Sequence, residues 1–81
     1  MNLENEIKEI VSNVIQVPVQ EISDNASFID DYGMDSLRIL EILAEIENKY
    51  KITINPEDIK KMVNVSGVIE LTQFYMKRRN E

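Results

Sequence analysis

Apolar residues that recur at helical spacing constrain the fold of this chain more than any other feature. The first stripe predicts an amphipathic helix over about residues 3–16, and it consists of Leu3, Ile7, Ile10, Val11, Val14 and Ile15. Pro18 ends this helix, because the residue before a proline avoids the α region. The run Lys51–Asn55 alternates like a strand but has no second strand to pair with, so we expect an extended loop that buries Ile52 and Ile54. The pattern therefore predicts helices only.

A long connector over residues 17–35 separates this helix from the next. A stretch of that length without regular structure is unusual in a compact domain and is often functional. Its apolar residues should pin it to the core: Val17, Val19, Ile22, Phe28 and Ile29. The second helix is expected from about Ser36 to Lys51. Its apolar residues cannot all face one neighbour, so some should line a groove or contact partners: Leu37, Ile39, Leu40, Ile42, Leu43 and Ile46.

Two more helices complete the expected fold. The Asn-Pro pair at 55–56 is typical of a helix start and predicts a short helix over about 56–62, with its apolar side chains inward: Ile59, Met62 and Val63. Asn64 or Ser66 caps a last helix to about Lys77, whose inward positions are Val68, Ile69, Leu71, Thr72 and Tyr75, with Phe74 beside them. The expected fold class is all-α, a small four-helix bundle of three main helices and one short helix with a long first loop.

Length and composition limit the classes of protein to which this chain can belong. The chain of 81 residues allows one small domain over 1–81. It has no cysteine and no histidine, so disulfides and the commonest metal ligands are missing. No stretch approaches the roughly 20 apolar residues of a membrane span, and the N-terminus lacks a signal peptide, so we expect a cytoplasmic protein without membrane insertion.

The negative charge is concentrated in one part of the chain. The formal net charge is −6, and residues 20–47 carry eight acidic residues and one basic residue, or −7. Such a field repels nucleic acid and steers a protein towards basic surfaces on partners. Asp30 and Glu41 have the first-to-twelfth spacing of a calcium loop, but Asp35 occupies the position that requires glycine. We therefore expect neither nucleic-acid binding nor a metal site.

The polar stretch around Ser36 is the main candidate for a functional site. Gly33 supplies the backbone freedom that a tight turn often needs. Either Asp35 or Ser36 can cap the following helix, because a short side-chain oxygen accepts first-turn N–H groups. Helix N-termini hold phosphate well, so a serine displayed there is well placed to carry a phosphodiester. On local grounds alone, a simple helix cap is the commoner role of such residues.

The residues from Asp24 to Leu37 resemble the segment around the attachment serine of acyl carrier proteins. They read Asp-Asn-Ala-Ser-Phe-Ile-Asp-Asp-Tyr-Gly-Met-Asp-Ser-Leu, and the resemblance extends over essentially the whole chain. It implies that a phosphopantetheinyl transferase attaches 4′-phosphopantetheine from coenzyme A to Ser36, within a motif that includes Gly33, Asp35 and Leu37. It also implies a carrier of acyl thioesters without a catalytic site of its own, in fatty acid or specialised polyketide-type biosynthesis.

The same resemblance implies that the second helix docks on the basic patches of acyl-transferring and condensing enzymes. Glu41 and Glu47 match the family's docking acids by position. Glu45 is a further acid nearby, offset by one residue from the family's usual pattern. Arg38 departs from the pattern, because many fatty-acid carriers have an acid directly after the Ser-Leu pair. A base there would weaken contacts evolved for an acid, which favours a specialised polyketide or peptide pathway.

Two alternatives from other classes stay open. One is a peptidyl or aryl carrier of nonribosomal peptide synthesis, which shares the prosthetic arm but not the cargo. The other is an unmodified helical interaction module that binds partners through the exposed Ile and Leu residues of the second helix. The length and the N-terminal Met1 favour a discrete carrier over a fragment of a large synthase, and we expect a monomer. Addition of coenzyme A and a transferase, followed by a mass measurement, separates the carriers from the module.

Overall fold

The computed structural model describes residues 2–79 and contains only helices and loops over that range. In chain order the elements are α1 (Leu3–Ile15), η1 (Val19–Glu21), α2 (Ser36–Tyr50), η2 (Pro56–Lys61) and α3 (Val65–Arg79). The predicted all-α fold with three long helices and a short one is confirmed, although the short element η2 is a 3-10 helix. Residues 1, 80 and 81 of the expected single domain lie outside the described range.

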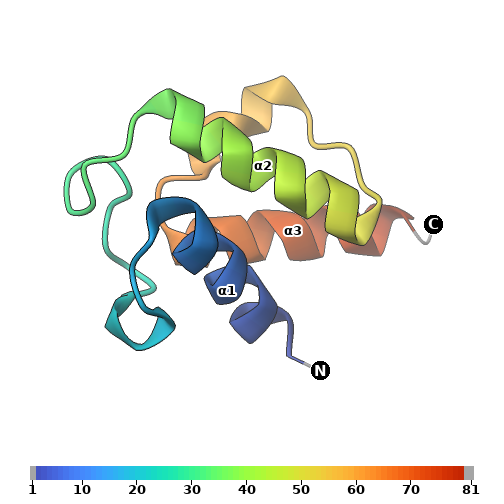
Figure 1. Cartoon of the computed structure of the whole chain (residues 1–81). Coiled ribbons are helices and arrows are strands. Elements are labelled where there is room, and N and C mark those ends of the chain that lie inside the picture. Colours follow the sequence, from blue (N-terminus) through green and yellow to red (C-terminus); the bar gives the residue numbers. More distant parts are fainter. Residues whose placement is uncertain (1, 80–81) are drawn as a thin grey trace.

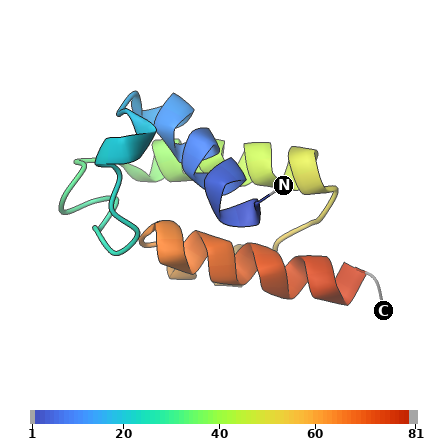
Figure 2. The same cartoon turned by 90° about the horizontal axis from the view of Figure 1, so that it is seen from below.

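The three long helices pack around one core. Helix α1 contacts both α2 and α3, and η2 packs on α3. Figure 2 shows α1 and α2 together above α3, with the connector at the end of the bundle where α2 begins. Figure 1 shows the same connector looping out before it enters α2. The connector therefore lies beside the start of α2 and sets the direction in which the chain enters that helix. Within residues 2–79, none of the helices is both long and apolar enough to cross a lipid bilayer.

Short polar side chains start the later helices, and left-handed residues end the first two long ones. The Asn64 side chain accepts the N–H of Gly67 at 2.7 Å, so Asn64, not Ser66, caps α3. Asn55 caps η2 as predicted. Gln16 and Lys51 adopt left-handed φ values of 60° and 56°, and each donates its N–H back into the last turn of its helix. These αL caps satisfy carbonyls that would otherwise be unpaired.

The core draws side chains from every long helix and from the connector. Its largest fully buried side chains are Phe28, Ile7, Ile42, Ile46, Met62, Val11, Val65 and Val68. The prediction that Phe28 plugs the core is confirmed, and Ile52 and Ile54 are buried in an extended loop as expected. Burial of this apolar surface is the main force that holds the bundle together.

Two apolar residues that were expected to face inward are exposed. Ile29 is 58% exposed and Val63 is 54% exposed. The two neighbouring segments meet through their backbones, because the N–H of Phe28 donates to the carbonyl of Val63 at 2.8 Å. With Phe28 turned into the core, its neighbour Ile29 faces outward. The sequence prediction was wrong for these two positions, and their exposure forms part of the site described below.

Thr72 is the only polar residue in the described core, and its fully buried hydroxyl has no hydrogen-bond partner within residues 2–79. A buried hydroxyl without a partner costs about 1–3 kcal/mol. We therefore expect Thr72→Val, which keeps the branched shape, to raise the free energy of unfolding by about 1 kcal/mol. The urea midpoint measures this change, and Thr53→Val at an exposed position is the matched control. A lower midpoint for Thr72→Val would show that the hydroxyl contributes to stability.

Candidate functional site

The turn before α2 is anchored by Phe28 and closed by Gly33. The N–H of Met34 donates to the carbonyl of Phe28 at 2.9 Å, and the N–H of Gly33 donates to the carbonyl of Ile29 at 3.1 Å. Gly33 has a φ of +64°, which side-chain-bearing residues rarely adopt, while no atom lies within 4 Å of the place a Cβ would take. Glycine is thus needed here for its backbone conformation and not for space.

Polar side chains brace the same turn from within. The carboxylate of Asp31 accepts the N–H of Ser27 at 2.7 Å, and the Ser27 hydroxyl accepts the N–H of Asp30 at 3.1 Å. The hydroxyl of Tyr32 accepts the N–H of Ser23 at 2.9 Å. Sequence reasoning missed these contacts, although serine and aspartate are frequent in turns because they bond to nearby backbone groups. The bracing fixes the direction in which the chain enters α2.

Ser36 is the first residue of α2 and is exposed. The cap is Asp35, whose carboxylate accepts the N–H of Arg38 at 3.1 Å. The Ser36 hydroxyl has no hydrogen-bond partner among the described residues and is accessible from outside. It stands at the positive end of the α2 dipole, where unpaired backbone N–H groups favour a phosphate. The structure thus settles the choice between the two candidate caps in favour of Asp35.

An apolar groove of about 410 Å³ opens beside Ser36. It lies between the connector, the start of α2 and the segment that contains η2, and its lining consists of Ser27, Ile29, Ser36, Ile39, Leu40, Ile59, Lys60, Met62 and Val63. The groove explains the exposure of Ile29 and Val63. It also confirms that the apolar residues of the second helix serve more than one neighbour, because Ile42 and Ile46 are fully buried while Leu40 is 45% exposed.

Leu37 lies next to Ser36 and is 63% exposed, the highest value among the large apolar side chains that are exposed. It is absent from the lining of the groove. Single exposed leucines are common on protein surfaces. The exposed apolar side chains that share the groove are Ile29, Leu40 and Val63, and such a cluster is typical of a contact surface.

A hydrogen-bond network fastens η2, one wall of the groove, to α3. The hydroxyl of Tyr75 donates to the carboxylate of Asp58 and accepts the N–H of Asn55, the latter at 3.1 Å. Lys61 forms an ion pair with Asp58 at 3.1 Å. The hydrogen bonds from Tyr75 and Lys61 hold the pKa of the Asp58 carboxyl below its usual value. This wall of the groove thus depends on an ionised side chain.

The lowered pKa of Asp58 predicts a pH dependence of stability. Because the folded-state pKa is below the unfolded one, the stabilisation is complete above the usual carboxyl pKa of about 4 and is lost as the pH falls through the folded-state value. We expect Tyr75→Phe to lower the urea midpoint near about pH 6 and to have a smaller effect near about pH 2.5. An effect of Tyr75→Phe that stays constant over this range would contradict the linkage.

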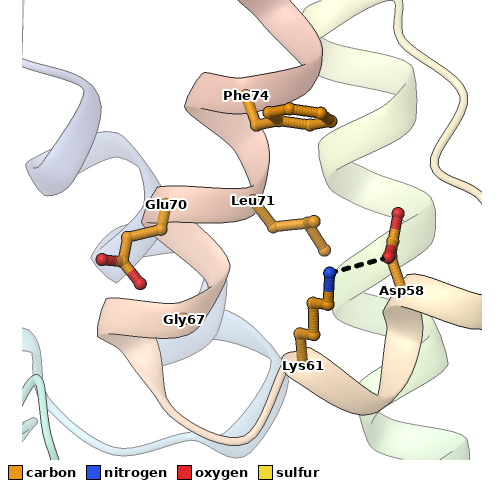
Figure 3. Close-up of a pocket in the computed structure, with 6 residues that line it drawn as sticks. All are labelled: Asp58, Lys61, Gly67, Glu70, Leu71 and Phe74. Atoms are coloured by element: carbon orange, nitrogen blue, oxygen red, sulfur yellow. Dashed lines mark ion pairs between the residues drawn. The ribbon is translucent and has the colours of Figure 1, made fainter.

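A second hollow of about 340 Å³ lies between η2 and α3, away from the serine. Figure 3 shows the Lys61–Asp58 ion pair facing Leu71, with Phe74 one turn further along α3 and Glu70 directed away from both. Gly67 permits the close approach of the two elements, because a Cβ there would come within 2.5 Å of the Lys61 carbonyl oxygen. Phe74, expected beside the inward positions of the last helix, is 51% exposed. The acid and base that face each other here already form an ion pair, and we assign no function to this hollow.

The four expected docking residues do not share one role. Arg38, Glu41 and Glu45 lie together on the outer side of α2, whereas Glu47 contacts the loop after it. The guanidinium of Arg38 forms an ion pair with Glu41 at 3.2 Å, and Glu45 is exposed one turn further along the same side. Glu47 is half-buried, and its carboxylate accepts the N–H of Ile54 at 2.8 Å. Glu47 therefore holds the loop after α2 in place, a role that its position in the sequence did not reveal.

An exposed serine at a helix tip beside an apolar groove is the arrangement expected of a small helical protein that carries a covalently attached group. A family model described as "Phosphopantetheine attachment site" matches residues 5–72. The chain is 38% identical to an acyl carrier protein of Buchnera aphidicola, over 99% of this chain and 96% of that protein. It is 40% identical to polyketide-8 synthase acyl carrier protein 1 of Streptomyces avermitilis, over 78% of this chain and 75% of that protein.

The fold agrees with these matches. A solution structure of holo acyl carrier protein from Geobacter metallireducens superposes with a TM-score of 0.79 and 21% identity, over 99% of this chain and 92% of that one. The chain therefore belongs to the acyl carrier protein family. Proteins of this family are carriers, and they hold 4′-phosphopantetheine covalently. The resemblance found in the sequence is confirmed.

Proposed function

We propose that Ser36 is the residue of this carrier that receives 4′-phosphopantetheine. The observation that supports this most directly is the exposed Ser36 hydroxyl, which has no partner among the described residues and stands at the first position of α2 on the edge of the apolar groove. Ser27 lines the same groove, but its hydroxyl is engaged with the N–H of Asp30. Ser36 thus combines an accessible hydroxyl, a phosphate-favouring helix end and an adjacent groove.

The chain's own residues determine how the attached group sits. In the transfer, the serine oxygen forms a bond to the phosphorus that carries the pantetheine arm of coenzyme A. The bond from that phosphorus to the adenosine bisphosphate breaks, and the hydroxyl proton leaves to a base of the transferase. The free N–H groups at the start of α2 would favour the negative charge of the phosphodiester formed at Ser36. Asp35 keeps that first turn in place by capping it at the N–H of Arg38.

The groove beside Ser36 offers shelter for part of an acyl chain bound to the arm. Its walls are apolar, and the exposed Ile29, Leu40 and Val63 would lose contact with water when a chain lies against them. We propose fatty acyl or polyketide-type intermediates as cargo, handed over by acyl-transferring and condensing enzymes with basic docking patches. A peptidyl or aryl cargo is the alternative. A single domain over 1–81, a monomer and a cytoplasmic location stay predictions from the sequence.

The test is to incubate the purified chain with coenzyme A and a broad-specificity phosphopantetheinyl transferase and to measure its intact mass. We expect the addition of one phosphopantetheinyl group, located on Ser36 by fragmentation of the modified peptide. Addition to another serine, or to none, would refute the assignment, and the latter would favour an unmodified interaction module. The intact mass of protein isolated from its source would then reveal the cargo.

A further inference from the structure

A polar hollow of about 460 Å³ lies between the end of α1 and the outer side of α2. It is lined by Asn13, Val14, Gln16, Arg38, Glu41, Ala44 and Glu45. It is separate from the groove beside Ser36, because the two share none of their lining residues. It contains three of the four charged residues that the sequence marks for docking. The arrangement of these charges can therefore decide which partner surface fits α2.

Two acceptors hold the guanidinium of Arg38 in this hollow. Its Nη1 atom donates to the carboxylate of Glu41 at 3.2 Å and to the backbone carbonyl of Val14 at 3.5 Å. Val14 belongs to the last turn of α1, which ends at Ile15, and the C-terminal end of a helix is its negative pole. Arg38 therefore joins α1 to α2, and its position next to Glu41 is favoured from two sides.

The pair changes which acids of α2 are available to a partner. Glu41 is already bound to Arg38, and Glu47 is bound to the backbone of Ile54. Glu45 is exposed and forms no ion pair within residues 2–79. A basic side chain of a partner can thus contact Glu45 without competition, whereas at Glu41 it must share the carboxylate with Arg38 and meets the repulsion of that positive charge.

We propose that Arg38 is a specificity-determining residue that withholds Glu41 from basic partners and leaves Glu45 as the docking acid. This inference rests on the proposed function, because it concerns the enzymes that act on Ser36. The partner that fits is an enzyme with a basic residue opposite Glu45. Both members of the pair are about half exposed, with side-chain exposures of 53% and 46%. An exposed pair of this kind corresponds to an effect of about two- to fivefold on binding.

A double-mutant cycle tests the proposal with the broad-specificity transferase and coenzyme A. Glu41→Gln and Glu45→Gln are each made in the wild type and in Arg38→Ala. For every variant and for both backgrounds, kcat and KM of the transferase reaction are measured at low salt. We expect the rise in KM caused by Glu41→Gln to be about two- to fivefold larger in the Arg38→Ala background. The rise caused by Glu45→Gln should be about the same in both backgrounds, because Glu45 does not pair with Arg38.

Two controls separate partner choice from a purely structural role. Arg38→Lys retains the charge and should retain much of the restraint on Glu41. Thermal melting of every variant reports any loss of the α1–α2 link. If Glu41→Gln and Glu45→Gln both act independently of Arg38, the proposal is refuted and Arg38 is only a strut between helices. Absence of any added group on Ser36 would refute the proposed function instead, so the two failures are distinguishable.

Discussion

Ser36→Ala should abolish the addition of the phosphopantetheinyl group while leaving the fold intact. The variant removes the only atom at this position that can form the phosphodiester. Its cost to stability should be within about 0.5 kcal/mol, because Ser36 is exposed and the cap of α2 is Asp35. We therefore expect no gain in intact mass after treatment with coenzyme A and transferase, and a urea midpoint close to that of the wild type.

Ser27→Ala is the matched control for this experiment. Ser27 lines the same groove, and its hydroxyl takes part in the turn before α2. Removal of that hydroxyl should cost about 0.5–2 kcal/mol, as for other side chains that cap backbone N–H groups, and should leave the modification in place. If Ser36→Ala still gained the group, or if Ser27→Ala lost it without unfolding, the attachment site would have to be reassigned.

Phe28→Ala should bring the domain close to unfolding. Phe28 is the largest of the fully buried side chains, and its backbone bonds to both Val63 and Met34. Replacement of a buried phenylalanine by alanine typically costs about 3–5 kcal/mol, because burial is lost and a cavity remains. The total free energy of unfolding of a native protein is only about 5–15 kcal/mol. The variant should thus approach the limit at which it no longer folds.

Chemical denaturation measures this loss directly, and Phe74→Ala is the matched control. Phe74 is 51% exposed. Its ring makes an edge contact with the ring of Tyr75, and the guanidinium of Arg78 lies over it. Its removal should cost about 1 kcal/mol or less. Phe28→Ala should also loosen the turn before Ser36, so the transferase should act on it with a higher KM. Equal losses for the two variants would contradict the role of Phe28 as the anchor of the connector.

The sequence was sufficient for the helices and for the candidate serine. Helical spacing of apolar residues and the capping residue Asn55 are local properties, and local properties can be read from neighbouring positions in the chain. The motif from Gly33 to Leu37 likewise depends on turn chemistry within a few residues. For the same reason the boundaries of α1 and α2 agree with the prediction to within about two residues at each end.

The errors in residue placement and role involve contacts between separate segments, whereas the missed bonds of Ser27 with Asp30 and Asp31 lie within one turn. Ile29 and Val63 were assigned to the core because they are apolar, but the bond between the backbones of Phe28 and Val63 places both side chains at the groove. Glu47 matched a docking position, yet it binds the backbone of a loop that folds back on it. Arg38 was recognised as a departure, but its link to Val14, 24 residues away in the sequence, was not visible.

The amino-acid sequence by itself determined that this chain forms helices around one core and displays a serine at the start of the second long helix. It did so because spacing, caps and turn residues act over a few positions. Only the tertiary structure decided which apolar residues form the groove, which acids of α2 already have a partner within the domain and that Arg38 links α2 to the end of α1. Those outcomes depend on how close separate segments approach, and that distance is set by the packing of the whole chain.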